Sequence, residues 1–402
     1  MAQTGSLDLT FGHNGSRIVD FSASHDKELI QDLQVSPNGE IVLGGLFYEY
    51  TAYGAARLTA EGRKDSTFNE DGVYFIQDYL APIYVAGAVA VLPDRRVIIG
   101  GQERSFNDNL PDRLWLKGLK ANGHPDPTFG NASVVLTDVS PFFDYAEDIS
   151  VLPDGRFLVA ATINSDEDQY ETPPSMAVLR YWPNGKLDST FGVNGVARIE
   201  TPGWPGRYVT EHIAVYPDGR IVVQSLRRIS TSSSWHFVTI ARLLPDGQPD
   251  AGFAFGAGFK VYTISPYHAE DVVALLPLPD GKLIFIGNWR NFSGNYVYYQ
   301  AKLEENGMPE YNFSPSGMIE FPIPCDWGEY FGVSDAVMQP DGKIIVAGQG
   351  LFDKMLIARH LTSGELDPAF GENGYRIYDI PGLEGSIYTA LQPNGKIITA
   401  AE

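Results

Sequence analysis

Cysteine is almost absent from this 402-residue sequence, which contains Cys325 and no other. One cysteine excludes an intrachain disulfide, a cysteine-rich zinc site and a Cys-x-x-Cys redox pair. Histidine is also scarce: the seven residues form neither an H-E-x-x-H motif nor an i, i+4 pair, so a zincin site is not predicted. A Walker A loop, a G-x-S-x-G elbow and a strand-helix G-x-G-x-x-G phrase are missing too. The common motif-defined enzyme classes are therefore not predicted.

Positive charge and long apolar runs are the other deficits. Lys and Arg number 29 against 50 Asp and Glu, a formal net charge of -21 that disfavours nucleic acid and anionic lipid as partners. No apolar run approaches the ~18 residues of a membrane span, so no membrane insertion is expected. The first residues, MAQTGSLDLTFG, lack the basic and apolar regions of a Sec signal peptide. We expect a soluble, acidic protein that is cytoplasmic or exported by a leaderless route.

Glycine, proline and aromatic residues are abundant. The chain has 42 Gly and 27 Pro, with 12% aromatic and 44% hydrophobic residues. This hydrophobic content is sufficient for a buried core, and the turn-forming residues favour many short strands over a helical bundle.

One phrase, G-x-x-D-x-x-F followed in most copies by G-x-N-G, returns along the whole chain. A conserved spacing of 57 to 62 residues separates its copies, which is the signature of a repeat architecture. The acid is Asp in six copies and Glu310 in the other. The aromatic residue of the phrase is Phe11, Phe68, Phe129, Phe191, Phe253, Phe313 and Phe370.

A second phrase, P-[DN]-G-[KRE] or a close variant, recurs in the same register and divides each unit into four predicted strands. Strand A follows the Asn-Gly turn (196–199), and strand B precedes the Pro-Asp-Gly turn (149–152). Strand C follows that turn as an apolar run (343–348), and strand D carries a basic residue (240–243). Pro, Asp and Gly suit a tight hairpin turn between B and C. The Asp of the first phrase is predicted to bond turn amides, and its Phe to fill the space between units.

Seven such units predict an all-β, seven-bladed β-propeller in a single domain, residues 1–402, with four-stranded antiparallel blades and an incomplete last blade. Stacked sandwiches are the alternative. Because strand D of the last unit is missing, we place strand A innermost and strand D outermost. The exposed edge of the last blade is then a site for pairing with another copy as a homo-oligomer. The predicted units are approximately 5–65, 66–126, 127–188, 189–250, 251–310, 311–367 and 368–402.

The phrases G-x-L-D-x-x-F-G-x-N-G and Q-P-D-G-K-I-I-V-A-G resemble the bacterial delta-60 repeat, a β-propeller family whose biochemical role is mostly unassigned. The resemblance covers essentially residues 5 to 402. It implies the fold and says almost nothing about function, because the shared residues belong to turns and core.

The connections fall into two sets, which the alternation of strands places on opposite faces of a propeller. The B–C and D–A turns are uniform, whereas the A–B and C–D loops vary in length and composition. A variable face on a uniform scaffold is typical of recognition, and exposed aromatic residues suit a sugar or a peptide. The alternative is that these rings pack the loops onto the blades. The candidate ligand-binding residues are Trp204, Trp235, Trp289, Trp327, Tyr145, Tyr208, Tyr267 and Tyr330.

A second set of candidates lies near the start of strand B, five residues before the turn Pro in most units. It consists of Asp32, Asp148, His212, Asp271 and Asp335, with Asp271 assigned on the assumption of a longer B–C turn. Around a central channel these side chains could bind a divalent cation such as calcium or act as an acid/base pair. The structural alternative is that they cap strand ends or bind channel water.

The leading functional hypothesis is a non-enzymatic recognition propeller that binds a carbohydrate or similar ligand, or a peptide, on the A–B and C–D face. The first alternative is a carboxylate-dependent hydrolase or lyase with its site at the channel mouth. The second is a protein-interaction scaffold. No cofactor is required by the sequence, and the catalytic residues of the enzyme alternative are unassigned.

Overall fold

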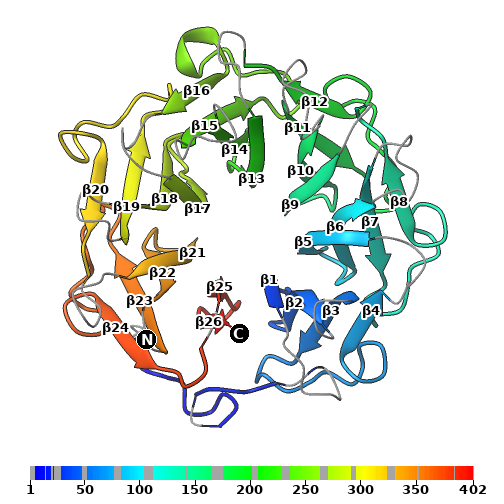
Figure 1. Cartoon of the computed structure of the whole chain (residues 1–402), viewed down its shortest axis with the longest axis horizontal. Coiled ribbons are helices and arrows are strands. Elements are labelled where there is room, and N and C mark those ends of the chain that lie inside the picture. Colours follow the sequence, from blue (N-terminus) through cyan, green and yellow to red (C-terminus); the bar gives the residue numbers. More distant parts are fainter. Residues whose placement is uncertain are drawn as a thin grey trace.

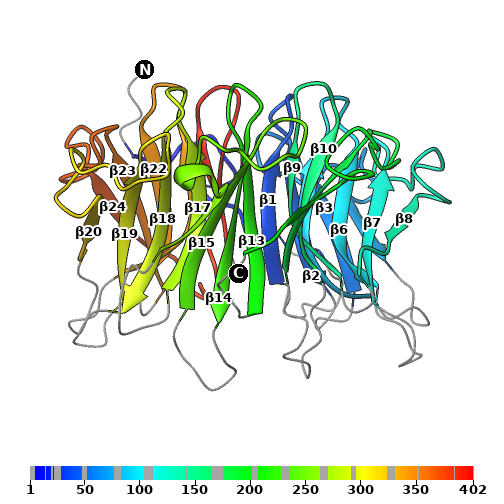
Figure 2. The same ribbon diagram turned by 90° about the horizontal axis from the view of Figure 1, so that it is seen from above.

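The computed structural model shows a ring of β-sheets around a central axis (Figure 1), with all strands running roughly across the thickness of the ring (Figure 2). The structure describes residues 5–13, 15–19, 21, 29–47, 52–76, 83–103, 112–140, 144–163, 175–201, 207–228, 236–262, 270–290, 296–323, 331–350, 353–383 and 385–401. Nothing in this described part is a helix long and apolar enough to cross a membrane.

Six sheets have four antiparallel strands each and form the blades. Their innermost strands are β1, β5, β9, β13, β17 and β21, and chain order runs outward within each sheet. The first blade consists of β1 (Leu29–Val35), β2 (Ile41–Phe47), β3 (Ala52–Leu58) and β4 (Val73–Ile76), and the second of β5 (Ile83–Val91), β6 (Val97–Glu103), β7 (Arg113–Leu119) and β8 (Val134–Thr137). The third blade consists of β9 (Tyr145–Val151), β10 (Phe157–Ile163), β11 (Ser175–Tyr181) and β12 (Val196–Ile199), and the fourth of β13 (Arg207–Val215), β14 (Ile221–Arg228), β15 (His236–Leu243) and β16 (Phe259–Tyr262). The fifth blade consists of β17 (Glu270–Pro277), β18 (Leu283–Arg290), β19 (Tyr296–Leu303) and β20 (Met318–Phe321), and the sixth of β21 (Gly332–Met338), β22 (Ile344–Gln349), β23 (Lys354–His360) and β24 (Tyr375–Asp379).

The expected count of seven blades is wrong, because six sheets have four strands and the seventh repeat has only two. β25 (Tyr388–Leu391) and β26 (Ile397–Ala400) form a two-stranded hairpin, here called the closing hairpin, between β21 and β1. No described strand pairs with the outer edge of β26. Without a third strand among the described residues, residues 17–19 form no strand, and Ser16 pairs only with His13 of its own turn. The all-β class and the four-stranded antiparallel blades are as predicted.

The predicted order of strands within a blade is also wrong. Strand B is innermost and strand A is outermost, because the G-x-x-D-x-x-F phrase is a hairpin turn inside one sheet rather than a link between two. The pairing of β11 with β12, from Met176↔Ile199 to Leu179↔Val196, shows this directly. Each repeat therefore contributes its strand A to the blade of the preceding repeat.

The B–C turns are identical in length in all seven repeats, with five residues between the two strands. In the third blade, the N–H of Leu152 donates to the carbonyl of Arg156 at 2.8 Å, and Gly155 has φ of 85°. A positive φ at that position favours glycine, which six of the seven turns have. The second repeat has Arg95 there, with φ of 70°. The predicted B–C hairpin is confirmed by the pairing of β9 with β10.

A cation, a carboxylate and a phenyl ring meet at the D–A turn, in a cluster that we call the turn node. In the third blade, Arg180 Nε lies 2.8 Å from Asp188 Oδ2, and its guanidinium lies 4.6 Å from the ring centroid of Phe191. Arg156, the last residue of the B–C turn, reaches the same carboxylate at 2.9 Å. Burial opposes ionisation of Asp188, but bonds from Thr190 and Arg156 and the nearby Arg180 outweigh it and lower its pKa to about 2.

The turn node also joins neighbouring blades. Arg180 Nη1 donates to the carbonyl of Pro245 in the next blade at 2.6 Å. The ring of Phe191 packs against Gly247, where an added Cβ would lie 2.8 Å from the ring, so that the glycine permits the close approach. Phe191 is fully buried. The interblade position predicted for the Phe of the repeat is confirmed.

The N-terminal segment closes the ring against the last repeat. Gly5 packs on the ring of Phe370, and the hydroxyl of Tyr378 donates to the Gly5 carbonyl. From the closing hairpin, Gln392 Nε2 donates to the carbonyls of Gly39 and Ala60 in the first blade at 3.0 and 2.9 Å. Both ends of the described chain are thus tied to the opposite side of the seam.

Replacement of Phe191 by Ala should lower the free energy of unfolding by about 3 to 5 kcal/mol, because it removes a fully buried ring between two blades. Phe255, which is 87% exposed on a nearby turn, provides the matched control. Phe255→Ala should change stability by less than about 0.5 kcal/mol. Urea unfolding followed by tryptophan fluorescence measures both, and equal losses in the two variants would contradict the turn-node description.

Candidate functional site: the central channel and the loop face

The channel is bordered by strand B of every repeat, and its acidic side chains link neighbouring strands. Asp32 on β1 accepts the N–H of Val89 on β5 at 2.8 Å. Asp148 on β9 accepts the N–H of Ile213 on β13 at 2.9 Å. Each of these carboxylates therefore satisfies a backbone N–H of the next innermost strand.

Asp335 on β21 repeats the arrangement with the closing hairpin. Its Oδ2 accepts the N–H of Thr389 at 2.7 Å, while Oδ1 accepts the N–H of Ala336 in its own strand at 2.7 Å. Asp148 Oδ1 likewise accepts its own neighbour, Ile149. A carboxylate that bonds one N–H on either side of a seam replaces the missing ladder partner of an edge strand.

His212 on β13 occupies the corresponding position in the fourth repeat but bonds a carbonyl. Its Nε2 donates to the carbonyl oxygen of Val272 on β17 at 2.9 Å. The next seam is held by Asn288, which donates to the Val333 carbonyl at 2.7 Å and accepts the Val333 N–H at 2.8 Å. Sequence comparison missed Asn288, because it lies on strand C rather than strand B. Its counterpart in the third blade is Thr162, whose Oγ1 accepts the N–H of Thr210 on β13 at 2.9 Å.

Asp271 does not share the position of the other four predicted channel residues. The bulge of β17 lies between Val272 and Ala274, and Ala274 pairs with Ile286 as Asp32 pairs with Gly44. Ala274 is therefore the equivalent of Asp32, and the assumed longer B–C turn is absent. Asp271 is exposed at the beginning of β17.

Burial is the largest influence on the ionisation of the channel acids. It raises the pKa of Asp32 to about 7 and that of Asp335 to about 8, with mutual repulsion between the aspartates adding to the effect. The pKa of Asp148 is raised for the same first reason, while His212 opposes the shift. Burial also raises the pKa of Glu147, which accepts a bond from Thr162, to about 7.

The channel acids do not assemble into a metal centre. Within the described ranges, no group of three or more His, Cys, Asp or Glu side chains is close enough to hold an ion. The carboxylates of Asp32, Asp148 and Asp335 instead accept backbone N–H groups. These bonds agree with the alternative in which the side chains bond the backbone of neighbouring strands rather than bind an ion.

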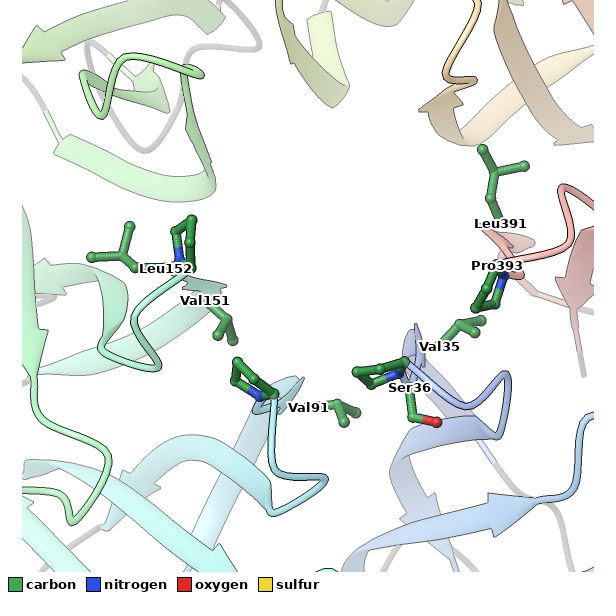
Figure 3. Close-up of a pocket in the computed structure, with 10 residues that line it drawn as sticks. Val35, Ser36, Val91, Val151, Leu152, Leu391 and Pro393 are labelled. Atoms are coloured by element: carbon green, nitrogen blue, oxygen red, sulfur yellow. The ribbon is translucent and has the colours of Figure 1, made fainter.

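At the end of the channel where the B–C turns lie, mostly apolar residues of the first three blades and the closing hairpin form an arc along one side of the channel (Figure 3). The arc lines a pocket of about 410 Å³. In sequence these residues precede or include the turn Pro, a regularity that comparison of the repeats could have revealed. The lining residues are Val35, Ser36, Pro37, Val91, Pro93, Val151, Leu152, Pro153, Leu391 and Pro393.

The opposite end of the ring is here called the loop face, because the A–B and C–D connections attach there. Among the aromatic residues predicted to bind a ligand, Trp289 is half-buried at the end of β18. Its indole N–H has no acceptor in the described part of the chain. Tyr145 is half-buried at the beginning of β9. Tyr208 is only 2% exposed and interacts with Thr201 and Arg227, so it packs the blade. Trp204, Trp235, Trp327, Tyr267 and Tyr330 lie outside the described residues.

Comparison with known sequences supports a β-propeller repeat family. Residues 36–68, 152–191, 217–253 and 339–370 match a family model described as "Domain of unknown function (DUF5122) beta-propeller". No curated protein is significantly similar to the chain in sequence. The delta-60 assignment stays a prediction.

Solved structures show likeness in fold at low sequence identity. Hydrazine synthase of Kuenenia stuttgartiensis is 12% identical with a TM-score of 0.50, and the match covers 96% of this chain and 99% of that one. A protein of unknown function from Dyadobacter fermentans DSM 18053 is 14% identical, covering 88% and 94%, with a TM-score of 0.44. An alpha-L-arabinanase of Penicillium chrysogenum, complexed with arabinobiose, is 12% identical, covering 78% and 92%, with a TM-score of 0.49.

The stability of the protein should be greatest near pH 4 to 5. Because the folded-state pKa values of Asp32 and Asp335 are raised, the folded state binds protons that the unfolded state has lost, and stability falls as pH rises from about 4 to 8. The lowered pKa of Asp188 acts in the opposite direction, so its contribution is lost as pH falls below 4. Melting temperatures measured from pH 2 to 9 test both the decline above pH 4 and the loss of stability below it.

An Asp32→Asn, Asp335→Asn double variant should flatten the decline between pH 5 and 8, because the two titrating groups are gone. Asp246, an exposed aspartate in a D–A turn, provides the control, and Asp246→Asn should keep the decline. An unchanged slope in the double variant would show that the channel carboxylates are not responsible.

Proposed function

We propose that this chain is a non-enzymatic recognition propeller that binds carbohydrate on the loop face. The observation that carries the proposal is the contrast between the two faces. Every B–C turn has five residues, whereas the C–D connections range from residues 48–51 to residues 164–174. Longer loops cost more conformational entropy to order, and the scaffold closes with short turns, so the added length supports a role in recognition rather than folding.

Trp289 is the described residue that best fits a sugar-binding role. Its ring is half-buried against the core between the fourth and fifth blades, and its buried indole N–H has no acceptor among the described residues. An indole provides an apolar surface for a sugar ring together with a hydrogen bond for a hydroxyl.

The channel acids do not favour the hydrolase or lyase alternative. A catalytic carboxylate must reach a substrate proton or carbon, but Asp32, Asp148 and Asp335 each bond a backbone N–H of the adjoining strand. A glycan array combined with a broad hydrolase screen separates the proposals. Selective, saturable binding without turnover supports recognition, whereas turnover that depends on two carboxylates contradicts it.

Trp289→Ala should weaken binding of a glycan identified on the array by about 5- to 150-fold, the equivalent of about 1 to 3 kcal/mol for a hot-spot aromatic residue. Trp289→Phe keeps most of the packing and removes the N–H, so it separates the two contributions. Trp182, 43% exposed beside a turn on the opposite face, provides the control. Isothermal titration calorimetry measures the affinities, and equal affinity in Trp289→Ala and Trp182→Ala would remove Trp289 from the site.

A further inference from the structure

The N-terminal segment carries a preformed copy of the turn node. In the complete nodes of the first and third blades, an Asp, a Thr two residues later and a Phe three residues later surround the Arg of strand D. Arg57 contacts Asp65 at 2.8 Å, Thr67 at 3.1 Å and the ring of Phe68 at 4.7 Å. Asp8, Thr10 and Phe11 reproduce this set, and we call them the N-terminal socket.

The internal geometry of the N-terminal socket matches the complete nodes. Thr10 Oγ1 lies 2.6 Å from Asp8 Oδ1, as Thr67 Oγ1 lies 2.7 Å from Asp65 Oδ1. Phe11 packs on Gly62 of the first blade, as Phe191 packs on Gly247. The socket is therefore folded and docked without a strand-D residue in it among the described parts of the chain.

In the third to sixth blades two cations contact the carboxylate, and the counterpart of one of them is present here. Lys396 Nζ on the closing hairpin lies 2.5 Å from Asp8 Oδ2, as Lys343 lies 2.9 Å from Asp367 in the sixth blade. In that blade Arg359 from strand D also contacts Asp367, at 2.8 Å. No described residue takes the place of Arg359 beside Asp8. The side chain of Asp8 is 34% exposed, against 1% to 11% for its five counterparts that pair with a strand-D base.

The backbone around the N-terminal socket also lacks its strand partner. In the sixth blade the N–H of Asp367 donates to the Arg359 carbonyl, and the N–H of Arg359 donates to the Gly374 carbonyl. The corresponding groups of the N-terminal segment are the N–H of Asp8 and the carbonyl of Gly15, which have no such bonds to the described residues. They define the register that an added strand would take.

The outer edge of β26 provides the other side of the same position. Residues 344–347 of the equivalent strand β22 are fully buried, whereas Ile397, Thr399 and Ala400 are half-buried. The added strand would therefore cover apolar surface on β26 and pair with its free edge.

We propose that the closing hairpin and the N-terminal socket bind an extended segment of a partner polypeptide, whose Arg enters between Asp8, Thr10 and Phe11. The strands that fill this position in the blades give the recognition pattern: apolar residues, then Ala or another apolar residue, then Arg or Lys, then Leu, Tyr or His. Residues 354–361, KMLIARHL, are one example. The net charge of -21 agrees with a cationic segment as the partner.

A fluorescein-labelled peptide KMLIARHL is the probe, and the same peptide with Ala in place of Arg is its control. The Arg peptide should bind with saturable anisotropy, and the Ala peptide should bind about 10-fold or more weakly, because a charged hydrogen-bonding group is lost. Asp8→Asn should weaken binding of the Arg peptide by a similar factor, and Asp246→Asn should not. Hydrogen exchange should slow in residues 397–400 when the Arg peptide is bound.

Equal binding of the two peptides, or full binding to Asp8→Asn, would overturn the proposal. A dimer of the chain alone that Asp8→Asn dissociates would also overturn it, by making a second copy the occupant. A chain extended at its N-terminus by the same strand, with Arg eight residues before Asp8 as Arg359 precedes Asp367, provides an independent measurement. Its melting temperature should exceed that of the Ala-containing extension, and equal melting temperatures would contradict the socket.

Discussion

The ring depends on the buried pairing of a strand-D cation with the carboxylate of the D–A turn. Arg180 and Asp188 are both nearly inaccessible to solvent, and Arg180 also reaches a carbonyl of the following blade. A buried charge pair is stabilising only when its remaining donors and acceptors are satisfied, and here Thr190, Arg156 and Pro245 satisfy them. The same cluster thus fixes the D–A hairpin and its distance from the next blade.

The second blade shows what happens when the cation is replaced. Gly118 stands where the other blades have Arg or Lys, and an added Cβ there would lie 2.3 Å from Phe129. The ring of Phe129 therefore occupies space that the base takes elsewhere, and the cation that contacts Asp126 is Arg96 of the B–C turn. In this blade the loss of the cation is accompanied by a phenyl ring in its place. In the N-terminal socket Phe11 stays half-buried, and no such replacement occurs.

Much of the fold could be predicted because the repeated residues are those that turns and seams require. Gly155 needs a positive φ, and Phe191 needs a glycine opposite its ring, so both recur with the period of the repeat. The order of strands from the inside to the outside of a blade could not be predicted. The phrase around Asp188 has residues that suit a hairpin turn within one blade and a link between two blades equally well. The prediction of seven blades failed because the repeated phrases do not show whether a third strand pairs with the outer edge of β26, and no described strand does so. The role of Asp148 required the structure, since its partner, Ile213, lies 65 residues away and bonds through its backbone.

Native-state hydrogen exchange measured by mass spectrometry tests most directly whether the strand-D cation and its strand hold the ring together. Residues 344–349 lie in a blade with a complete turn node, and residues 397–400 lie in the closing hairpin without one. The account predicts that amides of residues 397–400 exchange through local opening at least 100-fold faster than those of residues 344–349, a difference of about 2.7 kcal/mol in opening free energy. Equal protection of the two strands would contradict it.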